Sequence, residues 1–312
     1  PGRVAPEALE AITDRVAGML IATHSGTFHA DEVFAIAAMK LLPEPVEVLR
    51  TRDREMLAKA DVRIDVGFSH DPSSGDFDHH QREFDLTREN GIGYASFGLI
   101  WREYGALICG DAEVADAVEQ TLVQPVDAND TGQQISKSLI EGIRPMNVNA
   151  VIGGFNSRWD EDLNDEQERA RFDAALELAG GILEREIASA TSGLKAVRVV
   201  HEAIAGAEDP RIIELSENVP WKQVVVTEAP EALFVIYPKR QGFGLETVPR
   251  ELGTFENRKD LPAAWAGLEQ EELAELTGVA DALFCHAKRF LVVAGSRDGI
   301  GALAALAIDQ DG

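Results

Sequence analysis

The sequence predicts an α/β protein of two domains, with a parallel β-sheet in the N-terminal domain and a smaller α+β domain after it. The chain has 312 residues, and at about 100–200 residues per domain this length suggests two domains. Between residues 19 and 67, short apolar runs rich in β-forming residues alternate with stretches of helical periodicity, as in a parallel sheet with crossover helices. After residue 210, closely spaced β-type runs replace this alternation. We therefore expect one domain over 19–190 and a second over 191–312.

The alternation defines the elements of the N-terminal domain. We expect strands over 19–23, 46–51 and 62–67, and helices over 31–42, 53–60, 94–108 and 112–123. The polar stretch 68–93 is expected to be one long loop, and such a loop in a compact domain is usually functional. Open α/β sheets bind ligands beyond the carboxyl ends of their strands, so we expect the site there.

A strongly helical stretch over 165–190 leads towards the second domain, and Gly180 and Gly181 predict a bend or break in it. A helical or linker stretch follows, ending near Pro210. In the second domain we expect strands with little helix until the end of the chain, over 211–215, 222–227, 233–238, 244–249, 282–287 and 290–295.

The net charge of -25 limits the partners of the protein. Such a surface repels nucleic acid and anionic membranes at long range. It leaves room for a small phosphorylated substrate, because bound metal ions invert the local charge. No apolar run approaches the roughly 20 residues that span a bilayer, so no membrane association is expected.

The stretch 1–16 lacks a basic region followed by an apolar stretch, so it is not expected to be a signal peptide. Cys109 and Cys285 lie in apolar surroundings without a CxxC partner. Two buried reduced thiols are expected, which favours a cytoplasmic location; a disulfide or a thiolate metal site is the alternative.

Histidines and acids gather in the N-terminal half. Five of the seven histidines lie between residues 24 and 80. His24 follows the first predicted strand, and His29 and Asp31 stand at the start of the helix after it, so one loop can aim three ligands at one point. Asp31 has an alternative role as the N-cap of that helix.

Asp65 is an acid in an otherwise apolar strand, which is costly unless its charge is compensated. It could bridge two metals, or be a structural aspartate bonded to loop amides.

Asp78, His79 and His80 form the next polar segment. Adjacent histidines on an extended chain point to opposite sides, so one could bind metal while the other faces substrate. Asp78 could orient an imidazole through its second nitrogen. Asp127 and Asp130 follow a helical stretch; either could complete the coordination, or both could belong to a simple turn.

These motifs resemble a known family. GTFHADE, RTRD, DVG, FDHHQR and VDANDTG occur in this order and at similar spacing in the melanocyte-proliferating-gene exonuclease family, a branch of the DHH phosphoesterases. The resemblance runs from about residue 19 to residue 309 and includes Trp159 and the closing segment FCHAKRFLVVAGSRDGIGALA. It implies a DHH-like N-terminal domain and a C-terminal substrate-binding domain. The implied ligands of a two-metal centre are His24, His29, Asp31, Asp65, His79 and one of Asp127 and Asp130.

The resemblance also implies roles in catalysis. His80 would face the phosphate, and Asp78 would act beside it. His29 stands where most relatives in the wider superfamily carry Asp. Relatives often have Gly-Gly-His where this chain has Ala294-Gly295-Ser296, which puts substrate contacts in that loop in doubt. Candidate substrate-binding residues are Arg52, Arg82, His286 and Arg297, the arginines as anion clamps; their alternative is a solvated surface.

The expected reaction is two-metal hydrolysis of a phosphoester, with Mn²⁺ preferred and Mg²⁺, Co²⁺ or Zn²⁺ as alternatives. The leading hypothesis is a 3′–5′ exonuclease acting on short RNA, oligonucleotides or nucleotides. The alternatives are a hydrolase of a small phosphorylated or pyrophosphate substrate, which the acidity favours, and a non-catalytic nucleotide-binding protein. Homo-oligomerisation is left open.

Overall fold

The computed structural model of the chain describes residues 18–310. The stretch 1–16, in which the sequence predicts no signal peptide, lies outside the described residues, as do the last two residues of the predicted C-terminal domain. The chain divides into two compact units between Thr191 and Ser192. The described residues form two five-stranded sheets and many helices, so the mixed α/β class is confirmed.

The N-terminal sheet has the strand order β2-β1-β3-β5-β4. Strands β1 (Met19–Thr23), β2 (Val46–Arg50), β3 (Val62–Ile64) and β5 (Asp76–Phe77) run parallel, and β4 (His70–Asp71) is antiparallel to β5. The three predicted strands are confirmed, although β3 ends three residues before residue 67. Because β1, β3 and β5 are neighbours, the residues that follow them emerge side by side at the carboxyl edge.

The prediction of one loop over 68–93 is wrong. This stretch contains β4, a 3₁₀ turn over Pro72–Ser74, and β5. The turn closes at Gly75 with φ +74°, where a Cβ atom would overlap the Asp61 carbonyl. Strands of two residues show no alternation of polar and apolar positions, so the sequence carried no signal for them.

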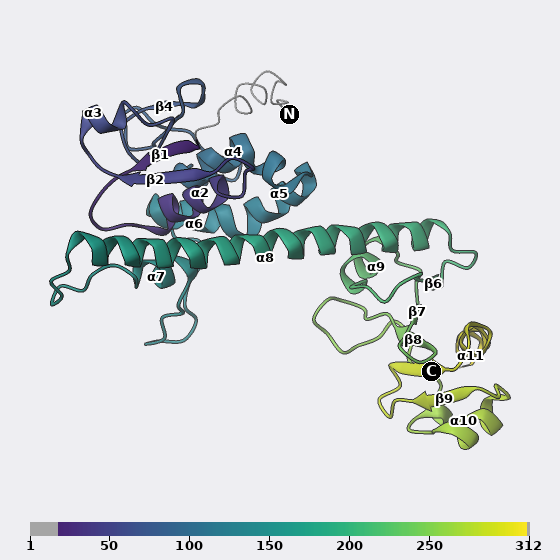
Figure 1. The fold of residues 1–312 in the computed structure, drawn as a ribbon. Helices are drawn as coiled ribbons and strands as arrows, with labels where there is room; N and C mark the ends of the chain where they lie inside the picture. The colour runs from purple at the N-terminus through teal and green to yellow at the C-terminus, as the bar shows by residue number, and fades with distance from the viewer. Residues whose placement is uncertain (1–17, 311–312) are drawn as a thin grey trace. The chain divides into compact units, whose positions relative to one another are not determined.

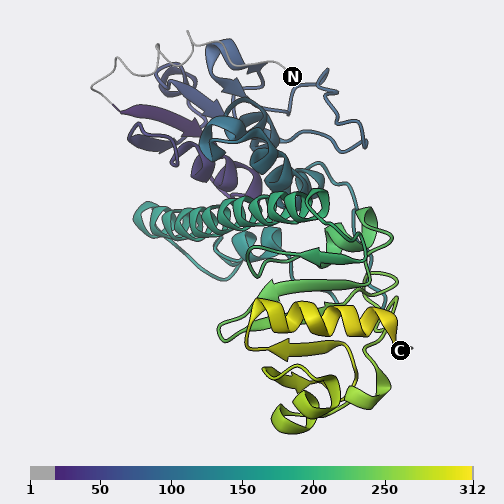
Figure 2. The same cartoon turned by 90° about the vertical axis from the view of Figure 1, so that its right-hand side faces the viewer.

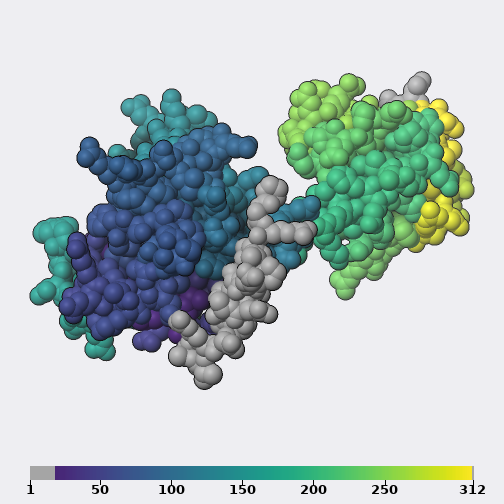
Figure 3. Space-filling view, turned by 90° about the horizontal axis from the view of Figure 1, so that it is seen from above, coloured from purple at the N-terminus to yellow at the C-terminus, as the bar shows by residue number. Residues whose placement is uncertain are grey.

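The helices of the N-terminal unit follow the prediction closely at first. They are α2 (Ala30–Met39), α3 (Arg54–Leu57), α4 (Ser96–Cys109) and α5 (Ala112–Val118). A π-helical turn over Glu119–Val123 then continues α5 into α6 (Gln124–Asp130), and α7 (Val148–Gly153) follows. Every residue of α2 is buried. On the face seen in Figure 3, little of the darkest purple, which marks the start of the described chain, is visible.

The long helix α8 (Asp165–Ala205) is unbroken, so the predicted bend at Gly180–Gly181 is wrong (Figure 1). Ala175, Ala179 and Leu183 of α8 lie in the core of the N-terminal unit on both sides of the glycine pair. This packing stabilises the helix where propensity alone would weaken it.

The C-terminal sheet has the strand order β6-β7-β8-β10-β9. Its strands are β6 (Ile212–Glu214), β7 (Phe234–Pro238), β8 (Phe243–Thr247), β9 (Ala282–Cys285) and β10 (Leu291–Ala294), and only β6 and β7 pair in parallel. Helix α11 (Arg297–Asp309), yellow in Figure 2, lies along this sheet.

Two expectations for this unit are wrong. The stretch 222–227 is not a strand but part of helix α9 (Lys222–Glu228), whose Val224 and Val225 are buried beside Trp221. Burial of one helical face therefore overrides the β propensity of the valines. A 3₁₀ turn over Ala263–Trp265 and helix α10 (Gln270–Thr277) also come before the final helix.

Both cysteines are free thiols, as expected, but only Cys285 is buried and Cys109 is partly exposed. Burial raises the pKa of each thiol to about 11. Among residues 18–310, no helix combines the length and the apolar character that crossing a membrane requires.

We predict that Gly180→Ala stabilises the N-terminal unit by about 0.5–1 kcal/mol, because Ala restricts the unfolded chain and favours helix. Apart from the adjacent residues and the backbone of the same helix, no atom lies within 4 Å of a Cβ built at Gly180. Urea unfolding followed by circular dichroism measures the change. Gly98→Ala in α4 is the contrasting variant, since its Cβ would overlap the Asp127 carboxylate, and it should lose about 1–3 kcal/mol. A loss of stability in Gly180→Ala would show that α8 requires glycine there.

Candidate metal centre

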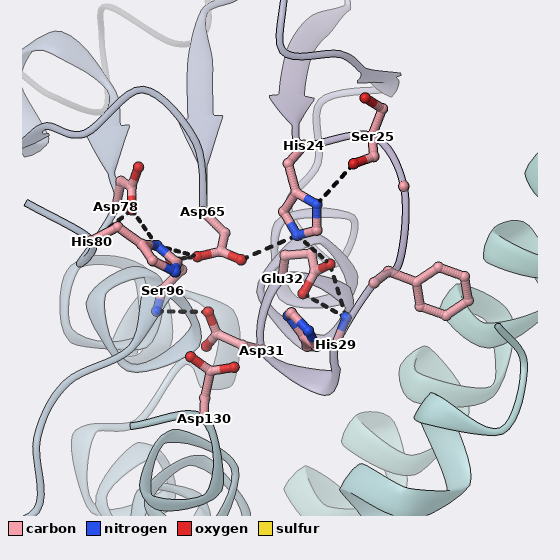
Figure 4. Close-up of polar contacts among 12 residues, drawn as sticks. His24, Ser25, His29, Asp31, Glu32, Asp65, Asp78, His80, Ser96 and Asp130 are labelled. Carbon is pink, nitrogen blue, oxygen red and sulfur yellow. Dashed lines mark hydrogen bonds and ion pairs between the residues drawn. The ribbon is translucent and has the colours of Figure 1, made fainter. Parts of the chain in front are cut away.

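Side chains from three strand ends and two helices converge at the carboxyl edge of the N-terminal sheet (Figure 4). His24 follows β1, Asp65 follows β3 and Asp78 follows β5. The segment His29–Glu32 begins α2, and Asp130 ends α6. The convergence is a consequence of the topology, since neighbouring parallel strands end at the same edge.

Asp65 lies at the centre of this cluster and is 4% exposed. One carboxylate oxygen is 3.2 Å from His80 Nδ1 and 3.4 Å from His79 Nε2, and the other is 3.3 Å from His24 Nε2. Burial would raise the pKa of Asp65, but the three imidazoles outweigh burial and hold the pKa well below its usual range. The partners of this carboxylate are imidazoles and the Ser96 hydroxyl, not the loop amides of the alternative structural role.

The first ligand group contains His24, His29, Glu32 and Asp65, whose ligand atoms all lie within 4.8 Å of one another. His24 Nε2 is 2.9 Å from Glu32 Oε1. Burial would lower the pKa of His24, but Asp65 and Glu32 raise it to about 10. The His29 backbone N–H donates to both Glu32 oxygens, at 3.0 and 3.1 Å. These four residues could hold one cation.

Glu32 is a further candidate, absent from the ligands that the motifs implied, and it is fully buried. It stands three residues after His29, the N-cap of α2, which is the spacing of a capping-box glutamate. That spacing is visible in the sequence. The contact of the same carboxylate with His24 is not, because it depends on where β1 ends relative to α2.

A second ligand group contains Asp31, His79 and Asp130, again with ligand atoms within 4.8 Å. His79 Nε2 is 3.1 Å from Asp130 Oδ2. This nitrogen is buried and, among the described residues, forms no well-aligned hydrogen bond; a cation would satisfy it. Burial would lower the pKa of His79, but the nearby carboxylates of Asp130 and Asp65 raise it to about 11.

Asp31 binds the start of α4. Its two oxygens accept the backbone N–H groups of Ser96, at 2.9 Å, and Phe97, at 2.7 Å. The alternative role as N-cap of its own helix is wrong, because His29 holds that position. Burial, and then the negative charge of Asp130, raise the pKa of Asp31 well above its usual range. A carboxylate with two amide partners keeps further lone pairs, so Asp31 can still bind a cation, which would offset the repulsion.

Asp78 fixes His80. One Asp78 oxygen accepts the His80 backbone N–H and lies 2.9 Å from His80 Nδ1, and the other accepts the Phe68 N–H at 2.7 Å. Asp65 and Asp78 raise the pKa of His80 to about 9. The prediction that His79 and His80 point to opposite sides is wrong: their ring centroids are 4.4 Å apart, and both reach Asp65. The strand has already ended at Phe77, so the alternation of a strand does not apply.

The structure separates Asp127 from Asp130. Asp127 is fully buried; one oxygen is 2.8 Å from an Arg88 guanidinium nitrogen and the other accepts the Gly98 N–H at 3.0 Å. Burial raises the pKa of Asp127 to about 7 although Arg88 lowers it. Asp130 has ligand atoms in a candidate cation group, and Asp127 does not. Both lie in α6, so the alternative of a simple turn is wrong.

The predicted substrate-binding residues belong to both units. Arg52 is exposed and its Nε donates to the Ser25 carbonyl at 3.3 Å. Arg82 is exposed two residues after His80. In the C-terminal unit, Arg297 pairs with Glu214 at 2.7 Å, and His286 Nδ1 accepts the Lys288 N–H at 3.1 Å.

A family model described as MYG1_exonuc, Uncharacterised protein family (UPF0160), matches residues 20–308. The chain belongs to the MYG1 family. The resemblance that the motifs predicted is therefore confirmed.

MYG1 relatives align over most of the chain. It is 32% identical to the MYG1 exonuclease of Homo sapiens, over 93% of this chain and 86% of that protein. It is 31% identical to MYG1 protein C694.04c of Schizosaccharomyces pombe, over 91% and 94%. It is 32% identical to MYG1 protein YER156C of Saccharomyces cerevisiae, over 92% and 95%.

We predict that Asp130→Asn and Asp127→Asn affect different properties. Asp130→Asn should weaken binding of Mn²⁺ by at least about tenfold, because it removes a charged ligand oxygen. Asp127→Asn should leave Mn²⁺ affinity within about twofold, but should lower the free energy of unfolding by about 3 kcal/mol, because Arg88 loses a buried partner. Calorimetric titration and urea unfolding measure the two effects, and the opposite pattern would identify Asp127 as the ligand.

Proposed function

We propose that this protein is a divalent-metal-dependent phosphoesterase that removes nucleotides from the 3′ end of short RNA or oligonucleotides. The observation that carries the proposal is the position of Asp65 at the meeting point of the ligand groups. Asp65 shares one group with His24, His29 and Glu32, and another with His79 and His80, and His79 also belongs to the group of Asp31 and Asp130. A carboxylate shared in this way suits a pair of cations. The name of the human relative, MYG1 exonuclease, supports the choice of reaction.

The donor set fits two cations. One would be held by His24, His29, Glu32 and Asp65, and the other by Asp31, His79, Asp130 and Asp65. Mixed imidazole and carboxylate ligands favour Mn²⁺ over Mg²⁺, with Co²⁺ and Zn²⁺ as alternatives. When bound, two cations would lower the pKa of a shared water and neutralise charge on the phosphoryl oxygens.

His80 would contact the substrate, and Asp78 would orient His80. His80 Nδ1 contacts a carboxylate oxygen of both Asp78 and Asp65. The other ring nitrogen, Nε2, is therefore available to bind substrate. The ring is about half exposed, so Nε2 can donate a hydrogen bond to a phosphate oxygen. Asp78 sets the direction of that donor, because it also binds the His80 backbone.

The charge of the chain supports a short substrate. Long polyanions need a continuous basic track, and the net charge is -25. Arg297, the candidate clamp in the C-terminal unit, is already paired with Glu214. The same acidity favours the second candidate function, hydrolysis of a small phosphorylated or pyrophosphate substrate. We expect the protein to act in the cytoplasm, where thiols stay reduced.

We predict that activity depends on a divalent metal and on the proposed ligands. Chelation should abolish release of nucleotides from short RNA, and Mn²⁺ should restore it. Asp65→Asn and His79→Ala should each lower kcat by at least about a hundredfold, beyond the effect of a residue that only supports a ligand. His201→Ala is the control, because His201 is exposed in α8 and contacts Glu228. Equal losses in all three variants, or activity that survives chelation, would contradict the assignment.

We also predict a preference for short substrates. With Mn²⁺ fixed, kcat/KM should rise only over the first few nucleotides and then level off, and its dependence on salt should be shallow. Single strands lose affinity with a log–log slope of about −0.7 per contacted phosphate, so few contacts mean a small slope. A length series from a dinucleotide to about twenty nucleotides at several salt concentrations measures both. A rate that climbs along the whole series and collapses in salt would indicate an extended nucleic-acid track instead.

Cleavage of pyrophosphate alone would favour the second candidate function, hydrolysis of a small substrate. Metal binding without any cleavage would favour a non-catalytic nucleotide-binding protein.

A further inference from the structure

A small pocket of about 180 Å³ lies against the loop of the metal centre. Its walls include Gly26–Phe28, Arg50, Asn156, Ser157, Glu168 and Arg171. Gly26–Phe28 belong to the loop that joins His24 to His29. The same short loop therefore forms one wall of the pocket and carries a candidate metal ligand at each end, His24 and His29.

Asn156 holds this wall in place. Its side chain accepts the Phe28 backbone N–H at 2.9 Å and donates to the Phe28 carbonyl at 2.7 Å. The oxygen and the nitrogen of the Asn156 side chain both bind the Phe28 backbone, so this side chain fixes the loop and is not available to bind a ligand. The pocket is preorganised, which lowers the cost of binding.

Arg50, at the end of β2, brings a positive charge to the pocket. The guanidinium carbon lies 4.5 Å from the ring centroid of Phe172 and 5.3 Å from that of Phe28. One terminal nitrogen donates to the Gly26 carbonyl. The Nε atom is buried and has no hydrogen-bond partner among the described residues. A buried donor without an acceptor costs about 1–3 kcal/mol. Arg50 is only partly buried as a whole and lines the pocket, so its positive charge is what the pocket offers to a ligand oxygen.

The other charged groups decide which anion fits. Both terminal nitrogens of Arg171 bind Glu161, at 2.8 and 2.9 Å, so Arg50 is the wall's available cation. Glu168 also lines the pocket and would repel a dianion more than a monoanion. A phosphodiester carries one negative charge, whereas a terminal phosphate carries up to two near neutral pH. The pocket therefore suits a phosphodiester.

We propose that this pocket binds a second, uncut phosphodiester of the substrate through Arg50, next to the linkage being hydrolysed. The inference rests on the proposed nuclease function. It assigns a recognition role to Arg50, which precedes the predicted clamp Arg52 by two residues. A dinucleotide has only the linkage that is cut, whereas a trinucleotide also supplies the uncut one.

The test compares three substrates with wild-type protein and Mn²⁺: a dinucleotide, a trinucleotide, and a trinucleotide with an uncharged methylphosphonate at the linkage that is cut second. We expect kcat/KM for the normal trinucleotide to exceed that of the other two by about tenfold, mainly through KM, since a hydrogen bond to a charged group is lost. Arg50→Gln should remove this preference, so that the three substrates are cleaved with similar kcat/KM, while loss of the contact with the Gly26 carbonyl lowers all three rates alike. Arg211→Gln, which removes an exposed arginine paired with Asp209, is the matched control.

The experiment distinguishes failure of the pocket proposal from failure of the proposed nuclease function. Equal rates on the two trinucleotides in the wild type, or a trinucleotide preference that persists in Arg50→Gln, would overturn the pocket's role while the nuclease function stands. Absence of cleavage of every substrate by the wild type would overturn both. Ser157→Leu, which places an apolar side chain at the pocket, should reproduce the loss of preference without touching Arg50, and an unchanged preference there would also contradict the inference.

Discussion

The contact of one carboxylate with three imidazoles organises the N-terminal unit. Asp65 has φ +56°, in the left-handed region that few residues other than glycine adopt. That conformation ends β3 abruptly and brings the side chain against His24, His79 and His80. A buried charge in an apolar strand would be costly if it stood alone. Here the imidazoles compensate it, so the ends of β1, β3 and β5 are joined through a single side chain.

The cluster is also tied to the core through helix α4. The first amides of α4 belong to Ser96, Phe97 and Gly98, and each donates to an acid: the first two to Asp31 and the third to Asp127. A helix N-terminus favours negative charge, so α4 stabilises two carboxylates that would otherwise repel each other. Asp127 pairs with Arg88, whereas Asp31 belongs to a candidate cation group with His79 and Asp130. This division explains how two buried acids in the same region can differ in role.

The loop of residues 25–28 joins the candidate metal centre to the pocket that we propose for a phosphodiester. Arg50 and Arg52 both donate to carbonyls of this loop, those of Gly26 and Ser25, and Asn156 binds Phe28 on both sides. A loop held at successive residues keeps His24 and His29 at a fixed separation. The chain has a net charge of -25 and repels phosphates at long range. Beside this loop, the positive charge of Arg50 would instead attract a phosphate.

The sequence by itself determined the α/β class, the parallel strands of the N-terminal sheet and the family, because alternating apolar periodicity and the spacing of GTFHADE and FDHHQR are local properties. It also indicated that acids and histidines gather at the strand ends. It could not determine that Glu32 faces His24, that Asp130 and not Asp127 joins the ligand groups, or that α9 is a helix. Those outcomes depend on the π-helical turn that extends α5, on the left-handed residue after β3, and on packing against distant elements. Glu32 and His24 are only eight residues apart, but their contact depends on where β1 ends relative to α2. The surroundings of Asp130 and the burial of α9 depend on residues far apart in the chain, so only the tertiary structure could decide these outcomes.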